Sequence, residues 1–141
     1  MSGIAHQATC VAIGGRGLLI EGPTGSGKSS LALALIDRGA VLVGDDGVGL
    51  EPRDGALLAS PHPAIAGKLE VRNLGLIDFP TQARIPVALV VRLDADAPRF
   101  IDAAGLCELG GIALPLVLLT PFSPVLHLTA ERALIRYGLG R

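Results

Sequence analysis

The chain has 141 residues, half of them apolar, with 12 basic and 13 acidic residues and a formal net charge of -1. That length suits one domain with a single core and is too short for a motor ATPase with separate lid and effector modules. Because the charge is nearly balanced, neither nucleic acid nor a membrane is expected as a partner.

The cysteines and the apolar runs predict a cytoplasmic protein. Cys10 and Cys107 lie far apart and outside any metal-ligand spacing, which suits a reducing compartment better than a disulfide framework. Apolar runs such as residues 112–119 are shorter than the roughly 20 residues that a membrane-spanning helix needs.

Short apolar runs separated by glycine-rich turns make up the first part of the chain. Residues 8–13 and 17–22 are predicted to be two strands joined by a hairpin. Apolar residues at helical spacing predict a helix over residues 28–38, with Gly39 as its C-terminal cap. Residues 40–44 form the next predicted strand, which ends at two adjacent aspartates.

The rest of the chain is predicted to be mostly β up to a final helix. Residues 48–52 and 56–60 are read as short strands around a turn, and residues 85–93 as a buried central strand. Ser123 and Pro124 are predicted to be the N-cap and the first residue of the C-terminal helix. The fold class predicted from this order is α/β, with a mixed β-sheet and flanking helices.

A glycine-rich loop lies between the second predicted strand and the first predicted helix. From Gly22 to Ser29 its sequence is GPTGSGKS, which matches G-x-x-x-x-G-K-[ST] at every fixed position and in the strand–loop–helix context that supports the match. The backbone N–H groups of such a loop face phosphate oxygens, Lys28 is expected to reach the β- and γ-phosphates, and the Ser29 hydroxyl is expected to hold Mg²⁺. The predicted nucleotide-binding residues are Gly22, Pro23, Thr24, Gly25, Ser26, Gly27, Lys28, Ser29 and Ser30.

Two stretches compete to supply acidic groups near the metal. One ends at Asp45 and Asp46, the other at Asp78, and both follow apolar runs. The pair is expected on the strand next to the one that feeds the loop, at the sheet edge that carries the phosphates. Phosphoryl transfer to a hydroxyl uses one acidic group toward the metal and another to accept the proton, so a doubled aspartate favours a kinase over a hydrolase. The alternative is a turn whose side chains bond only local backbone.

Charged residues also interrupt the apolar stretch LEVRNLGLIDFP, residues 69–80. If this stretch is extended, Glu70 and Arg72 share a face. That arrangement permits either a surface ion pair or a metal ligand beside a phosphate-binding arginine, and the residues alone leave both open.

Together, GPTGSGKSSLAL, the strand ending in DD and LEVRNLGLIDFP resemble the catalytic domain of bacterial HPr kinase/phosphorylase, over most of residues 6 to 100. Asn73 stands where that family usually has glycine. The resemblance implies a P-loop fold related to phosphoenolpyruvate carboxykinase. It also implies ATP-dependent phosphorylation of a serine on HPr, the phosphocarrier of the sugar phosphotransferase system, with removal of that phosphate as a second activity of the family.

The resemblance also implies roles for individual residues. Lys28 and Ser29 would serve ATP and Mg²⁺, and one of the two aspartates would accept the proton, with Asp45 favoured. His6 matches the family's active-site histidine, and Arg99 a later arginine that would stabilise the transferring phosphoryl group. The predicted catalytic residues are His6, Lys28, Asp45, Asp46 and Arg99, and the predicted metal ligands are Ser29, Asp46 and Glu70. His62 and His127 are expected to be structural.

By the same resemblance, residues 1–141 are expected to be a single P-loop kinase catalytic domain, like the short version of the family without a separate N-terminal domain. A homo-oligomer is compatible with this. Two alternatives stay open: a P-loop kinase of a small metabolite, and a nucleotide-binding switch without transfer chemistry. The first normally adds a mobile lid with arginines over the phosphates, and the second leaves His6 and one aspartate without a function.

Overall fold

The computed structural model describes residues 4–140, and within them the centre of the fold is a nine-stranded mixed sheet. Its order is β1-β5-β6-β9-β3-β2-β4, and β11 pairs with both β9 and β10. The strands are β1 (Ile4–His6), β2 (Thr9–Ile13), β3 (Arg16–Glu21), β4 (Val41–Gly44), β5 (Val48–Arg53), β6 (Ala56–Pro61), β9 (Ile85–Leu93), β10 (Gly105–Leu109) and β11 (Ile112–Leu119). A separate hairpin consists of β7 (Lys68–Val71) and β8 (Gly75–Asp78).

Strand β9 is the central strand, as its apolar sequence predicts. Its first residues pair antiparallel with β6, and its later residues pair parallel with β3 on one side and with β11 on the other. Parallel strands end at the same edge of a sheet, so β3, β9 and β11 direct their following loops to one edge. That edge carries the glycine-rich loop.

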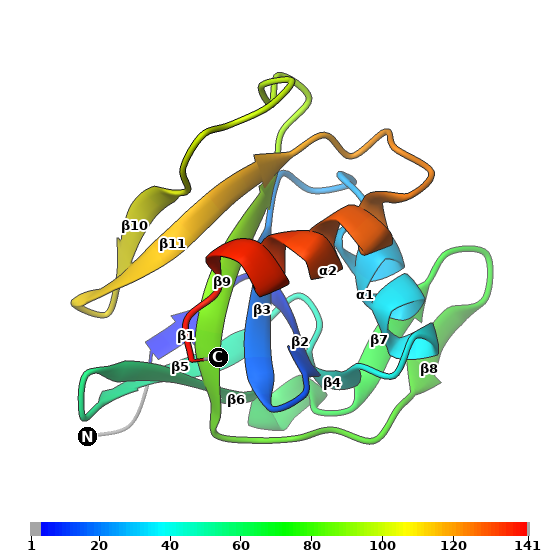
Figure 1. Ribbon diagram of the computed structural model, residues 1–141. Coiled ribbons are helices and arrows are strands. Elements are labelled where there is room, and N and C mark those ends of the chain that lie inside the picture. Colours follow the sequence, from blue (N-terminus) through cyan, green and yellow to red (C-terminus); the bar gives the residue numbers. More distant parts are fainter. Residues whose placement is uncertain (1–3, 141) are drawn as a thin grey trace.

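Two cores lie on opposite faces of the sheet because successive side chains of a strand point to opposite sides. Leu18 and Ile20 of β3 join the core beneath helices α1 (Lys28–Asp37) and α2 (Leu126–Tyr137), whereas Leu19 joins the second core. Figure 1 shows both helices on the same face of β3 and β9. The sheet curls so that β5 and β6 cover the second core.

Helix α1 ends as the sequence predicts. Gly39 has φ +107°, its N–H donates to the Ile36 carbonyl, and the Ala40 N–H donates to the Leu35 carbonyl. These two bonds form a Schellman cap, in which a residue other than glycine would be strained.

Helix α2 begins later than the sequence predicts. Its first residue is Leu126 and its N-cap position is Val125, so Ser123 and Pro124 precede the helix. Ser123 Oγ accepts a hydrogen bond from the Val125 N–H at 3.1 Å, and its carbonyl accepts one from the Leu126 N–H at 3.3 Å. The serine therefore closes a local turn instead of capping the first helical turn.

The position of β4 in the sheet also differs from the prediction. β2 lies between β3 and β4, so the strand that precedes Asp45 is not the neighbour of the strand that feeds the loop. Because β2 is antiparallel to both, β4 runs in the same direction as β3 and still ends at the same edge. The predicted proximity of the aspartates and the loop is therefore preserved.

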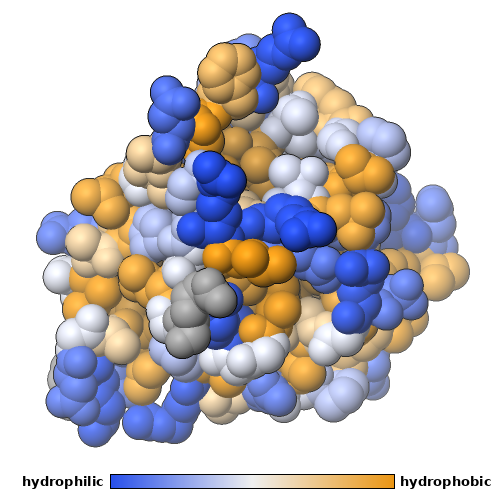
Figure 2. Space-filling model, in the orientation of Figure 1, coloured by the Kyte–Doolittle hydropathy of each residue, from blue (hydrophilic) through white to orange (hydrophobic). Residues whose placement is uncertain are grey.

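The surface is mixed in character around α2. Figure 2 shows hydrophilic and apolar residues interspersed on the face that carries this helix. Within residues 4–140, no helix has the length and apolar character needed to cross a membrane.

Candidate active site

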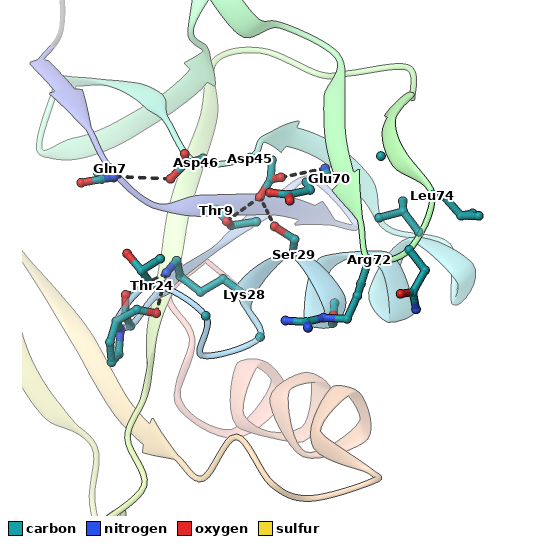
Figure 3. A pocket seen from close by; sticks show the side chains of 18 residues that line it. Gln7, Thr9, Thr24, Lys28, Ser29, Asp45, Asp46, Glu70, Arg72 and Leu74 are labelled. Carbon is teal, nitrogen blue, oxygen red and sulfur yellow. Dashed lines mark hydrogen bonds between the residues drawn. The ribbon is translucent and has the colours of Figure 1, made fainter.

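A hollow of about 740 Å³ opens at the sheet edge where β3 and β4 end. Its lining comes from the glycine-rich loop, the start of β2, the two aspartates and the β7–β8 hairpin (Figure 3). The lining residues are Gln7, Thr9, Gly22, Pro23, Thr24, Gly25, Gly27, Lys28, Ser29, Ser30, Asp45, Asp46, Glu70, Val71, Arg72, Asn73, Leu74 and Gly75. Three segments singled out in the sequence therefore meet around one cavity.

The glycine-rich loop has the geometry of an anion cradle. Gly25 and Gly27 have φ of +80° and +101°, which glycine adopts without strain, and no side chain caps the start of α1. The first N–H groups of the helix are therefore available to phosphate oxygens. A Cβ atom at Gly22 would lie 2.6 Å from Ser26 Oγ, a buried atom that has no hydrogen-bond partner among the described residues.

Lys28 lies across the mouth of this loop. Its Nζ donates hydrogen bonds to the carbonyls of Gly22, at 2.8 Å, and Pro23, at 3.1 Å. The ammonium group is thus held at the start of the loop, next to the space enclosed by the backbone N–H groups. This arrangement suits the β- and γ-phosphates of a nucleotide.

Asp45 is the centre of a hydrogen-bond network that joins three elements. Its Oδ1 accepts from Ser29 Oγ at 2.7 Å and from Thr9 Oγ1 at 2.9 Å, and its Oδ2 accepts from the Glu70 N–H at 3.0 Å. The residue is 7 % exposed. Both carboxylate oxygens are therefore already committed to donors, one of which is the hydroxyl predicted to bind Mg²⁺.

Asp46 is in a different environment. It is exposed, has φ +58°, and its Oδ1 is 3.5 Å from Gln7 Nε2, a long hydrogen bond. The side chain lines the hollow, and among residues 4–140 no buried donor holds it (Figure 3). Of the two aspartates, Asp46 is the one whose carboxylate is free to meet an incoming group.

The remaining acidic candidates, Glu70 and Asp78, lie at different ends of the β7–β8 hairpin. Glu70 and Arg72 both line the hollow, and Figure 3 shows the Glu70 side chain beside that of Asp45. Asp78 lies at the other end of the hairpin, where it is exposed and paired with Lys68. The structure thus favours the Asp45–Asp46 pair over Asp78 as the acidic site.

His6 and Arg99 do not line this hollow. His6 lies beside it, lining an adjoining hollow of about 600 Å³, and its Nε2 is 2.9 Å from Glu21 Oε2. Glu21 also accepts hydrogen bonds from Arg92. Arg99 is exposed in the loop after β9 and lines neither hollow.

Sequence reasoning missed Glu21 and Arg92. A partial signal was present, because Arg92 is the charged residue of the otherwise uncharged β9 and Glu21 ends β3 directly before the glycine-rich loop. The other two histidines line neither hollow. His62 caps a short helix, its Nδ1 accepting from the Ala64 N–H, and His127 lies in the first turn of α2.

The residues around Ser29 suit a cation that completes its shell with phosphate oxygens. Within residues 4–140, no group of three or more His, Cys, Asp or Glu side chains is arranged to hold a metal ion by itself. Mg²⁺ in nucleotide sites is usually held by one or two protein oxygens together with phosphates and water. The hydroxyl of Ser29 and the carboxylates of Asp45 and Glu70 are oxygen ligands of that kind.

Fold and site together define a P-loop domain of mixed α/β architecture. The model of the HPr Serine kinase C-terminal domain matches residues 2–83, more than half of the chain. The chain therefore belongs to the HPr serine kinase C-terminal domain family.

Relatives and a solved structure agree with this assignment. An HPr kinase/phosphorylase of Clostridium novyi is 37% identical over 140 residues, covering 89% of this chain and 46% of the relative, and one of Clostridium tetani is 49% identical over 67 residues, covering 48% and 22%. The chain thus spans less than half the length of these relatives. The structure of the Hpr(Ser) kinase/phosphatase from Coxiella burnetii matches with a TM-score of 0.83 and 28% identity, covering 94% of each chain. The fold predicted from the sequence motifs is thereby confirmed.

Proposed function

We propose that this chain is an ATP-dependent kinase that phosphorylates a serine of an HPr-like phosphocarrier protein. The observation that carries the proposal is the meeting of Lys28, Ser29 and the two aspartates around one hollow. A nucleotide switch needs the first two groups but has no use for a second, exposed carboxylate. The names of the relatives supply the substrate.

ATP and Mg²⁺ fit the groups that line the hollow. The loop N–H groups and Lys28 would hold the phosphates, and the Ser29 hydroxyl, with Asp45 and Glu70 behind it, would hold the cation. Mg²⁺ supplies neutralisation of the phosphate charge when it is bound. Asp45 keeps the Ser29 hydroxyl oriented, because that hydroxyl donates its proton to Oδ1 and so presents its lone pairs elsewhere.

We assign the general base to Asp46 rather than to Asp45, the residue favoured from the sequence. Asp45 is buried and its carboxylate already accepts three hydrogen bonds, so an incoming hydroxyl has less access to it than to the exposed Asp46. The exposed carboxylate of Asp46 can accept the serine proton as the serine oxygen forms its bond to the γ-phosphorus and the bond to the β–γ bridging oxygen breaks, which releases ADP. Asp46 was predicted from the sequence as a metal ligand, and we now propose Asp45 for that role.

The roles predicted for Glu70, His6 and Arg99 are supported to different degrees by their positions. Glu70 remains a candidate metal-site residue because it lines the hollow beside Asp45. His6 remains a candidate because it adjoins the loop. Arg99 would have to move with its loop to reach the phosphates, and Arg72, which already lines the hollow, is better placed for that purpose.

The test is incubation of the full chain with ATP, Mg²⁺ and purified HPr, followed by mass spectrometry of HPr. We expect a mass increase of one phosphoryl group on a serine, which disappears when Mg²⁺ is chelated. Transfer to a small metabolite in a parallel panel, with none to HPr, would replace the proposed substrate class. Because the relatives are named kinase/phosphorylase, the same assay with phospho-HPr and inorganic phosphate tests the reverse activity.

A further inference from the structure

The carboxylate of Glu21 contacts both His6 and Arg92 beside the glycine-rich loop. Its Oε1 accepts hydrogen bonds from Arg92 Nε at 3.1 Å and from Arg92 Nη2 at 2.9 Å, and its Oε2 lies 2.9 Å from His6 Nε2. The Glu21 side chain is 14% exposed, against 28% for His6 and 42% for Arg92. One largely buried carboxylate therefore holds two more exposed partners.

The fold places these three residues together. Glu21 and Arg92 are register partners on the parallel strands β3 and β9, at the carboxyl ends of both. Their neighbours Ile20 and Val91 belong to the core beneath the helices, so strand alternation puts Glu21 and Arg92 on the opposite face of the sheet. His6 lies three residues before Thr9, the first residue of β2, and Thr9 pairs with Ile20, the neighbour of Glu21 on β3.

The cluster lies at the start of the glycine-rich loop. Glu21 directly precedes Gly22, whose carbonyl accepts a hydrogen bond from Lys28. The hollow that the cluster lines shares Gln7, Gly22 and Pro23 with the nucleotide hollow, so the two open into each other at the start of the loop. A protein segment that reaches the nucleotide hollow through this second hollow would pass His6 and Arg92.

We propose that Glu21 is a positioning residue for phosphoryl transfer, acting through His6 and Arg92 on the segment that carries the acceptor serine; this rests on the proposed function. Glu21 occupies one ring nitrogen of His6 and two guanidinium nitrogens of Arg92. Among the described residues, His6 Nδ1 and Arg92 Nη1 form no hydrogen bond. These atoms are held in fixed orientations and are available to backbone carbonyls or side chains of a docked protein.

The test is Glu21→Gln, which keeps the shape of the side chain and removes its charge. Because Arg92 is already 42% exposed, water can solvate it in the variant, so the fold should survive. We expect the rate of transfer to HPr to fall roughly 10- to 100-fold, the loss typical of misplaced substrate. The dissociation constant for ATP with Mg²⁺ should stay within twofold, because no loop contact is altered.

Glu51→Gln is the matched control, since Glu51 also holds two arginines, Arg53 and Arg84, but lies outside both hollows. It should leave transfer unchanged. Arg92→Gln, alone and combined with Glu21→Gln, completes a double-mutant cycle. The transfer rate of the double variant should be little lower than that of either single variant. If the two losses in rate are additive, Glu21 and Arg92 do not act together.

A second readout separates this inference from the proposed function. In nitrogen NMR of the full chain, the ring signals of His6 should shift in Glu21→Gln and stay in place in Glu51→Gln. If the wild-type chain fails to phosphorylate HPr, the proposed function fails, and these signals still decide whether Glu21 orients His6. Unchanged His6 signals, or transfer by Glu21→Gln at the rate of Glu51→Gln, would overturn the positioning role.

Discussion

Replacing Asp45 with asparagine should damage the fold of the site as well as its chemistry. The carboxylate accepts three hydrogen bonds, from Thr9, Ser29 and the Glu70 N–H. An asparagine has one oxygen and one NH₂ group in place of the two carboxylate oxygens. If the NH₂ group faces Thr9 and Ser29, their hydroxyls must rotate to accept hydrogen bonds from it. If it faces the Glu70 N–H, two donors meet, and the backbone N–H cannot rotate away. A hydrogen bond to a charged acceptor contributes about 1.5–3 kcal/mol, and a neutral one about 0.5–1.5 kcal/mol.

From these contributions we expect Asp45→Asn to lower the free energy of unfolding by about 2–4 kcal/mol, since some bonds persist in neutral form and one becomes a donor–donor contact. For a chain of 141 residues this corresponds to a drop in Tm of about 6–12 °C. Urea unfolding of the apo protein measures it without any substrate. Binding of ATP with Mg²⁺ should also weaken, because Ser29 loses the acceptor that orients its hydroxyl.

Asp46→Asn is the natural comparison because that side chain is exposed and has no buried donor. Its unfolding free energy should stay within about 0.5 kcal/mol of wild type. Its kcat for HPr should fall by the roughly 10²- to 10⁴-fold typical of a lost general base. The reasoning is refuted if the pattern is reversed, with Asp45→Asn stable but inactive and Asp46→Asn unstable or fully active.

Three further predictions address the loop, the core and the end of α2. Lys28→Ala should weaken binding of ATP with Mg²⁺ by about tenfold to a hundredfold and abolish transfer, since a charge-assisted contact to the phosphates is lost; calorimetry and the HPr assay measure both, and retained turnover would remove the loop from the mechanism. Burial raises the pKa of the Cys10 thiol to about 12 from an ordinary value of 9.0, so the unfolded chain loses this proton first and stability should decline as pH rises from 9 toward 12, by about 1.4 kcal/mol per pH unit. Cys10→Ala should remove that part of the slope in denaturant titrations, and an identical slope in both proteins would contradict the assignment. Arg16 donates to the carbonyls of Leu139 and Leu134 at the end of α2, so Arg16→Ala should cost about 1–2 kcal/mol, against no measurable change for the surface control Arg53→Ala.

Local patterns predicted most of the elements that build the site. The loop, helix α1 with its Gly39 cap and the strand at residues 85–93 each carry their signal within a few residues. The insertion of β2 between β3 and β4 could not be predicted in this way, because strand order depends on pairing between distant segments. The β10–β11 hairpin was not predicted for a similar reason. β10 is largely exposed, so it lacks the buried apolar pattern of a strand, and it is held in the sheet by its pairing with β11.

The candidate site also contains features that could be predicted from the sequence and features that could not. The sequence predicted that the aspartates lie near the loop, and the family resemblance implied that Glu70 joins them. The structure brings these residues around one hollow. The sequence could not distinguish Asp45 from Asp46, because burial and φ differ between adjacent residues only once the strand ends and the chain turns. It also missed Glu21, because the pairing of β3 with β9 and with β2 is what brings Arg92 and His6 to it.

The parallel pairing of β3, β9 and β11 has a consequence for how this protein can diverge. The three strands end at one edge, but only the loop after β3 carries the phosphate-binding sequence. The loops at residues 94–104 and 120–125 follow the other two strands and expose Phe100 and Phe122, of which 78% and 76% respectively is accessible. Neither phenylalanine belongs to the core, whereas Ile101 and Ala104 of the first loop pack against it, so mutation can change the exposed positions around Phe100 and Phe122 at little cost to folding. The surface beside the glycine-rich loop can therefore diverge there while the loop itself is inherited unchanged.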